Sequence, residues 1–235
     1  MLIPPYKLKR SNIRALVSLG YEEYFAIAFG KTIEIFKNVK GENHLTFKGH
    51  DRDLEQISPC GDMIASASLT EIILWNWRNS NKYRRINTDS KSIRSIVLEE
   101  IEGSEKLRIL IGGSEVKVYS DIKINSNDRI NKKIQKNETI PILNENNCII
   151  TNYNTERRGW CLSLKKKEKS NNFFTTHAQA GNFIYMWTLH KGENQPKMSF
   201  ILEGTTGYLS NMVFAKNNTI ILGGKNPDIV FVDVE

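Results

Sequence analysis

The side chains that could do acid–base, nucleophilic or metal chemistry are few in this chain and widely spaced. None of the four histidines forms a His-x-x-x-His pair or a cluster with cysteine, so their spacing predicts no metal site. Three cysteines at irregular spacing favour free thiols over a disulfide framework. No Gly-x-Ser-x-Gly motif, phosphate-binding loop or dinucleotide fingerprint is present. We therefore expect a protein that is not an enzyme and that holds no metal and no cofactor. These residues are His44, His50, His177 and His190, with Cys60, Cys148 and Cys161.

Paired arginines offer a different chemistry, the recognition of phosphate. Arg157 and Arg158 stand side by side ahead of an apolar run, and two adjacent guanidiniums suit phosphate geometry. Glu156 directly before them would oppose an anion, so an ordinary surface turn is the alternative. The formal net charge of +7 permits an acidic partner, such as RNA, an anionic lipid or an acidic protein, without requiring one.

Repeated β-hairpins are the elements that must position these side chains. Each consists of a short apolar run, a turn and a second run, and no long segment has a helical period. Five hairpins of one design indicate an internal repeat. They are predicted at residues 24–29 with 32–36, 63–68 with 71–77, 107–113 with 115–119, 173–177 with 182–189, and 219–224 with 228–234.

The large side chain near the end of each second strand marks the period of this repeat. Successive steps are 39, 44, 68 and 45 residues, and three of them fit the roughly 40–45 residues of a four-stranded propeller blade. The long step indicates one blade with an insertion, which we place at residues 121–146 because that stretch is rich in Lys and Asn. The marker residues are Phe36, Trp75, Tyr119, Trp187 and Val232.

Residues 45–76 resemble one repeat of the WD40 family. They run through Gly-His, an apolar strand, Ser-Pro-Cys-Gly, a strand of small residues and a strand ending in Trp-Asn. The resemblance implies a β-propeller in which a histidine, a middle-strand hydroxyl, a turn acid and a tryptophan form a hydrogen-bonded chain within each blade. The family's turn Asp is missing, so Thr70 or Glu71 must replace it. The residues that match the blade motif are Gly49, His50, Ser66 or Ser68, and Trp75, with Trp187 and Asp233 in later, less complete copies.

The predicted fold is all-β, a β-propeller of about five four-stranded antiparallel blades forming one domain over residues 1–235. Blades are expected at 11–47, 53–86, 92–143, 147–204 and 208–235. The last blade shows three strands, and residues 2–8 precede the first, so we expect this N-terminal strand to complete the last blade and close the ring. An incomplete form of the seven-bladed ring common in the family is the alternative.

Two residue pairs are similar to binding motifs of WD-repeat proteins. The segment Trp75-Asn76-Trp77-Arg78 resembles the Trp-Asp-x-Arg box of ubiquitin-ligase substrate receptors, although Asn76 departs from it. We expect Trp77, an indole just past a strand, to be an exposed anchor for a partner. Arg157 and Arg158 are similar to the Arg-Arg-Gly motif with which some propellers bind phosphoinositides.

The expected function is a non-enzymatic scaffold that mediates protein–protein interactions in a multiprotein assembly of the cytoplasm or nucleus. One alternative is a basic propeller subunit of an RNA-containing complex of the ribosome-biogenesis type, and another is a phosphoinositide-binding propeller. No run approaches the roughly 18 apolar residues of a membrane span, and we recognise no signal peptide.

Overall fold

The computed structural model contains nineteen β-strands in the part of the chain that it describes, arranged as five antiparallel sheets. The described residues are 12–20, 23–37, 42–78, 83–88, 90–123, 149–153, 159–167, 170–178, 183–189, 198–201, 209–215, 218–224 and 229–234. Sheet one comprises β1 (Ile13–Ser18), β2 (Tyr24–Phe29), β3 (Thr32–Lys37) and β4 (Glu42–Lys48). Sheet two comprises β5 (Leu54–Cys60), β6 (Met63–Ser68), β7 (Glu71–Asn76) and β8 (Tyr83–Asn87).

The remaining three sheets follow the same order of strands. Sheet three comprises β9 (Ile93–Glu100), β10 (Lys106–Gly113), β11 (Val116–Lys123) and β12 (Ile149–Tyr153). Sheet four comprises β13 (Cys161–Lys166), β14 (Asn172–His177), β15 (Phe183–Thr188) and β16 (Met198–Ile201). Sheet five comprises β17 (Leu209–Phe214), β18 (Thr219–Gly224) and β19 (Val230–Asp233). In the four four-stranded sheets the predicted hairpin is therefore the central pair, and in sheet five it is the pair of β18 and β19.

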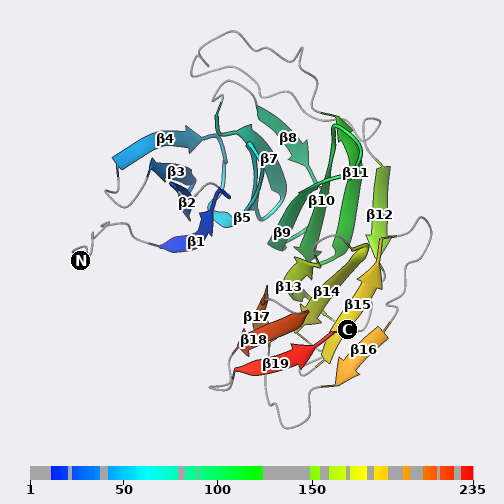
Figure 1. The fold of residues 1–235 in the computed structure, drawn as a ribbon. Coiled ribbons are helices and arrows are strands. Elements are labelled where there is room, and N and C mark those ends of the chain that lie inside the picture. Colours follow the sequence, from blue (N-terminus) through cyan, green and yellow to red (C-terminus); the bar gives the residue numbers. More distant parts are fainter. Residues whose placement is uncertain are drawn as a thin grey trace.

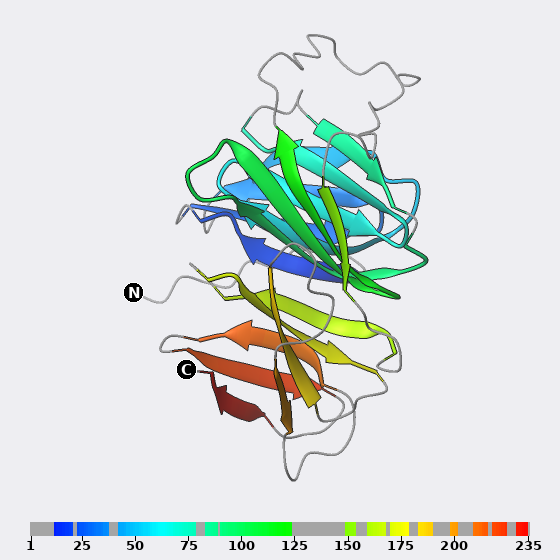
Figure 2. The ribbon, with the colours of Figure 1, turned by 90° about the vertical axis from the view of Figure 1, so that its right-hand side faces the viewer.

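The five sheets follow one another along an arc, as Figures 1 and 2 show. The first strand of each sheet packs against the first strand of the next, so that β1, β5, β9, β13 and β17 line the inner side. Among the described residues no helix has the length and apolar character needed to cross a membrane.

The hydrophobic core is divided into layers between successive sheets. Alternate side chains of a strand point to opposite faces, so a middle sheet serves two layers at once. In sheet two, Ile64 and Ile73 pack toward sheet one, whereas Ala65 and Leu74 pack toward sheet three. Sheets three and four share another layer, and sheets four and five share the last. Apolar packing between sheets is thus what holds the arc together.

The boundaries of the third sheet differ from those predicted from the sequence. Strand β11 continues to Lys123, and Ile122 is fully buried opposite Leu107, so residues 121–123 belong to a strand and not to an insertion. The strand β12 pairs with β11, which assigns residues 149–153 to the third sheet instead of the fourth. A register shift opposite Arg108, with Asp121 at a positive φ of 62°, breaks the alternation that would otherwise have revealed the continuation. Residues 124–148 lie outside the described part.

Among the described residues, the two end sheets carry most of the large exposed apolar side chains. Leu16 on β1 is 65% exposed and Phe231 on β19 is 67% exposed, with Val213 on β17 at 53%. Sheets in the middle of the arc bury both faces, whereas each end sheet buries one face against a single neighbour among the described sheets. The N-terminal strand expected at residues 2–8 lies outside the described residues.

Candidate functional site

A chain of hydrogen bonds runs through the interior of sheet two. The indole N–H of Trp75 donates to the hydroxyl of Ser66 at 2.7 Å, and His50 Nε2 lies 2.7 Å from the same oxygen. The Ser66 hydroxyl also donates to the backbone carbonyl of Ile73 at 3.2 Å. All three side chains are buried, which is where an indole and an imidazole need partners.

Glu71 occupies the place of the missing turn acid. Its Oε1 lies 2.8 Å from His50 Nδ1 and accepts the backbone N–H of Asp51 at 3.1 Å, while its Oε2 lies 3.2 Å from Arg85 Nε. Burial of this carboxyl favours its protonated form, but the hydrogen bond and charge of His50, the Asp51 N–H and Arg85 together outweigh burial. The pKa of Glu71 is consequently lowered from its ordinary value.

Gly49 is required by the position of Trp75. A Cβ at residue 49 would lie 2.8 Å from Cη2 of the indole, closer than packed carbon atoms approach. The ring itself is fixed by Phe47, whose centroid lies 5.0 Å away, so it has little room to move. The glycine before His50 therefore lets the chain pass over the indole.

A second buried chain of this kind lies in sheet four, but its histidine comes from a different element. Trp187 donates to the Thr175 hydroxyl at 2.7 Å, and His177 Nε2 lies 2.9 Å from that oxygen. The other ring nitrogen, His177 Nδ1, donates to the carbonyl of Gly159 at 3.1 Å. His177 has no role in the sequence motif, so its participation could not be anticipated. Both chains are internal and stabilise their sheets instead of facing a ligand.

Trp77 is not the exposed anchor expected from the sequence. It is 2% exposed, its indole N–H donates to the Gly61 carbonyl at 3.0 Å, and its ring lies 5.2 Å from that of Tyr24. Sheet one packs over the end of β7 and covers Trp77. The sequence of a single strand does not show such a contact with another sheet.

Of the arginines expected to bind partners, the structure describes only Arg78. Arg78 is half exposed, lies over the Trp77 ring and donates from Nε to Asp62 Oδ1 at 2.6 Å. Arg157 and Arg158 lie outside the described residues. Asp233 is exposed at the end of β19 and takes no part in either polar chain.

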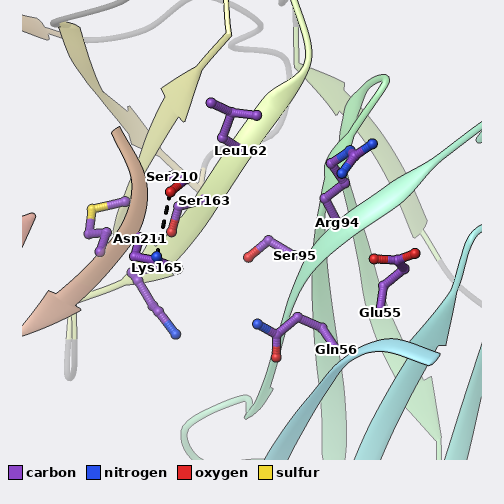
Figure 3. A pocket seen from close by; sticks show the side chains of 10 residues that line it. Glu55, Gln56, Arg94, Ser95, Leu162, Ser163, Lys165, Ser210 and Asn211 are labelled. Atoms are coloured by element: carbon purple, nitrogen blue, oxygen red, sulfur yellow. Dashed lines mark hydrogen bonds between the residues drawn. The ribbon is translucent and has the colours of Figure 1, made fainter. Parts of the chain in front are cut away.

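A polar cavity of ≈ 240 Å³ lies where the inner strands of sheets two to five converge, and we call it the central cavity. Figure 3 shows two walls, with Arg94, Ser95 and Gln56 on one side and Ser163, Ser210 and Lys165 on the other. The lining is dominated by hydroxyl, amide and charged groups, which suits a polar ligand better than an apolar one.

Trp160 and Arg94 form an exposed pair beside this cavity. Trp160 is 50% exposed in the connection before β13, and the guanidinium carbon of Arg94 lies 5.1 Å from its ring centre. Arg94 also lines the central cavity, so the exposed indole stands next to the polar opening. Trp160 escaped the sequence analysis because it looks like the first apolar residue of the following strand.

A second hollow, of ≈ 580 Å³, is lined by Glu99, Glu100 and Glu102, and the first of these forms two ion pairs. Glu99 Oε1 lies 2.8 Å from Arg108 Nη1, and Glu99 Oε2 lies 2.7 Å from Lys166 Nζ. These pairs neutralise the most buried carboxylate of the hollow, and the two further glutamates of its lining make it less suited to an anionic ligand than the central cavity.

The β-propeller domain of Cps50 (Swd1) from Myceliophteria thermophila is a solved structure similar to this one. The two superimpose with a TM-score of 0.65 over 91% of this chain and 62% of that one, at 9% sequence identity. This likeness shows the fold alone, a β-propeller arrangement. The chain spans about three fifths of the length of the domain it matches. No protein-family model matches the chain, and no curated protein sequence matches it.

Proposed function

We propose that the chain is a non-enzymatic scaffold that docks a protein partner on the surface formed by Trp160, Arg94 and the mouth of the central cavity, here called the Trp160 surface. The observation that carries the proposal is the exposed indole of Trp160, held by a guanidinium beside a polar opening. Trp and Arg are the residues most enriched among those that dominate binding energy at protein interfaces.

The other tryptophans support this choice by contrast. Trp75, Trp77 and Trp187 are 3%, 2% and 0% exposed, and each donates its N–H to a partner inside its own sheet. The large apolar surface of these three side chains is buried in the core. Trp160 alone keeps half of its surface exposed. Covering an exposed aromatic ring with a partner lowers the free energy of the complex.

The chemistry of the two described cysteines also favours a binding role over catalysis. Burial raises the pKa of Cys161 far above its ordinary value, and burial followed by the charge of Glu100 raises the pKa of Cys60. Both thiols therefore stay protonated at neutral pH, and a protonated thiol is a poor nucleophile.

The test is a Trp160→Ala variant of the full chain. A partner is identified by crosslinking in cells that produce the chain, purified, and titrated against the wild-type and variant proteins. We expect Trp160→Ala to weaken binding at least tenfold, because truncating a residue of this kind removes about 2 kcal/mol or more. Leu16→Ala, which truncates an even more exposed apolar side chain on sheet one, should leave affinity unchanged. Equal affinity of wild type and Trp160→Ala would overturn the proposal.

Completion of sheet five by residues 2–8 also belongs to this proposal. The sheet has three described strands, and a fourth would cover an open edge. A chain without residues 2–8 should then unfold at a lower denaturant concentration than the full chain, and identical unfolding curves would contradict the assignment. Binding of RNA, or of phosphoinositides through Arg157 and Arg158, stays a prediction that no described contact favours.

A further inference from the structure

Among the described residues, the lining of the central cavity carries more positive than negative charge. Its ionisable lining residues are Arg94 on β9, Lys165 on β13 and Glu55 on β5, which leaves one positive charge. The strand β17 contributes only uncharged groups, including Ser210 and Asn211. The cavity therefore complements a ligand that bears one negative charge.

Lys165 is the most informative member of this set. Its side chain is half-buried, and its ammonium has no carboxylate within ion-pairing distance in the part of the chain that the structure describes. Burial lowers the pKa of Lys165 from its ordinary value, because removing the ammonium from water disfavours the charged form. An ammonium without an anionic partner at a partly buried position is stabilised when a ligand supplies that partner.

The neighbouring groups could complete such an interaction with hydrogen bonds. Ser163 is buried on the same strand as Lys165, and Ser210 projects from the adjacent β17 toward the same space in Figure 3. Gln56 faces them from the opposite wall, so donors approach the space from both sides. A carboxylate accepts up to four hydrogen bonds through its two oxygens, which matches a lining of hydroxyl, amide and ammonium donors.

We propose that the central cavity receives the carboxylate of an Asp or Glu side chain from a partner polypeptide that lies across the Trp160 surface. This inference rests on the proposed function, because the polypeptide is held on that surface by Trp160. Glu55, on the wall that also carries Arg94, opposes more highly charged ligands such as phosphate, and the remaining charge of the lining balances one carboxylate. RNA is less suited, since single-stranded RNA uses several aromatic rings for stacking, and Trp160 is the exposed aromatic residue that the structure describes at this cavity.

The probe is a fluorescein-labelled decaglutamate peptide, titrated with the full chain at low salt and followed by fluorescence anisotropy. Lys165→Met removes the ammonium and keeps an apolar stem of similar length, and we expect it to weaken binding at least fivefold. Lys48→Met makes the same change of charge at an exposed position on β4, and it should change affinity less than twofold. Equal effects of the two variants would mean that only net charge attracts the peptide, which would overturn the inference.

A second variant keeps the test decisive if Lys165→Met does not fold. Glu55→Gln removes the opposing carboxylate, so it should tighten decaglutamate binding severalfold, whereas Glu42→Gln on the outer strand β4 should not. Decaglutamine, with no charge, should fail to bind. A decauridylate RNA that binds more tightly than decaglutamate, with the same dependence on Lys165 and Glu55, would overturn the assignment of a carboxylate.

The two proposals fail in different experiments. If Lys165→Met and Glu55→Gln leave decaglutamate binding unchanged while Trp160→Ala still releases the purified partner, the carboxylate inference is wrong and the docking surface stands. If Trp160→Ala does not affect the partner, the docking surface is wrong and the inference that rests on it falls too, whatever the peptide does.

Discussion

His177 holds in sheet four the register position that Ser68 holds in sheet two. Trp75 lies opposite Ile64, and Trp187 lies opposite Phe173, which aligns the two sheets. Two residues after Ile64 comes Ser66, and two after Phe173 comes Thr175, the hydroxyl partners of the two indoles. The next inward position is Ser68 in one sheet and His177 in the other. The polar chain therefore depends on the hydroxyl–indole pair, while the histidine can be supplied by either of two elements.

The two serines of β6 should differ sharply in their contribution to stability. Ser66 bonds to His50, Trp75 and Ile73, so Ser66→Ala leaves buried polar groups without a partner and should lower the free energy of unfolding by about 1–3 kcal/mol. The Ser68 hydroxyl is buried without a hydrogen-bond partner among the described residues, so Ser68→Ala should be neutral or stabilising. Urea unfolding of both variants measures the difference, and similar losses would contradict the assignment.

Glu71 should make the protein less stable in acid. Because its pKa is lower in the folded than in the unfolded chain, its contribution is present above the ordinary value of 4.5 and is lost as pH falls below that value toward the folded pKa. Glu71→Gln should reduce stability by about 1–3 kcal/mol at pH 7 and flatten the decline of stability between pH 5 and 3. The free energy of unfolding measured across this range tests it. Glu42→Gln, at an exposed position, should reproduce the wild-type profile.

The contact between Gly49 and Trp75 predicts that even one added methyl group is harmful. Gly49→Ala brings its Cβ to 2.8 Å from the indole, and the packed ring must shift, which should reduce stability by about 1–3 kcal/mol. Gly223→Ala is the matched control, since nothing lies within 4 Å of a Cβ there. Thermal melts of the two variants give the comparison, and an unchanged melting temperature for Gly49→Ala would show that the ring moves freely.

The hairpins and the polar chain of sheet two are predictable from the sequence because they depend on local order. Alternation and turns fix each hairpin, and His50, Ser66 and Trp75 follow one another at the spacing of one repeat. Glu71 could also be named in advance as one of two candidates to replace the family's turn Asp, since the turn is short and Thr70 is the other candidate. These features need no knowledge of neighbouring sheets.

The exposure of aromatic residues is not predictable in the same way, because it depends on what packs from other sheets. Trp77 looks free at the end of a strand, yet Tyr24 of sheet one covers it. Trp160 looks like part of a buried strand, yet it is 50% exposed, and Arg94 of sheet three lies over its ring. In both cases the residue that contacts the indole is distant in the chain. Which tryptophan is exposed therefore depends on how the sheets are arranged.

The end of β11 gives the last prediction, which separates a core position from an exposed one. Ile122 is fully buried between β10 and the core shared with sheet two, so Ile122→Ala should lower the free energy of unfolding by about 2–5 kcal/mol through lost contacts and a cavity. Leu16→Ala removes a similar side chain that is 65% exposed, and it should stay within about 0.5 kcal/mol of wild type. Denaturant unfolding of both variants decides the matter. If Ile122→Ala is as mild as Leu16→Ala, residues 121–123 belong to an insertion, as the sequence suggests, and β11 ends before them. If instead Leu16→Ala is as damaging as Ile122→Ala, the exposed face of sheet one is covered in solution.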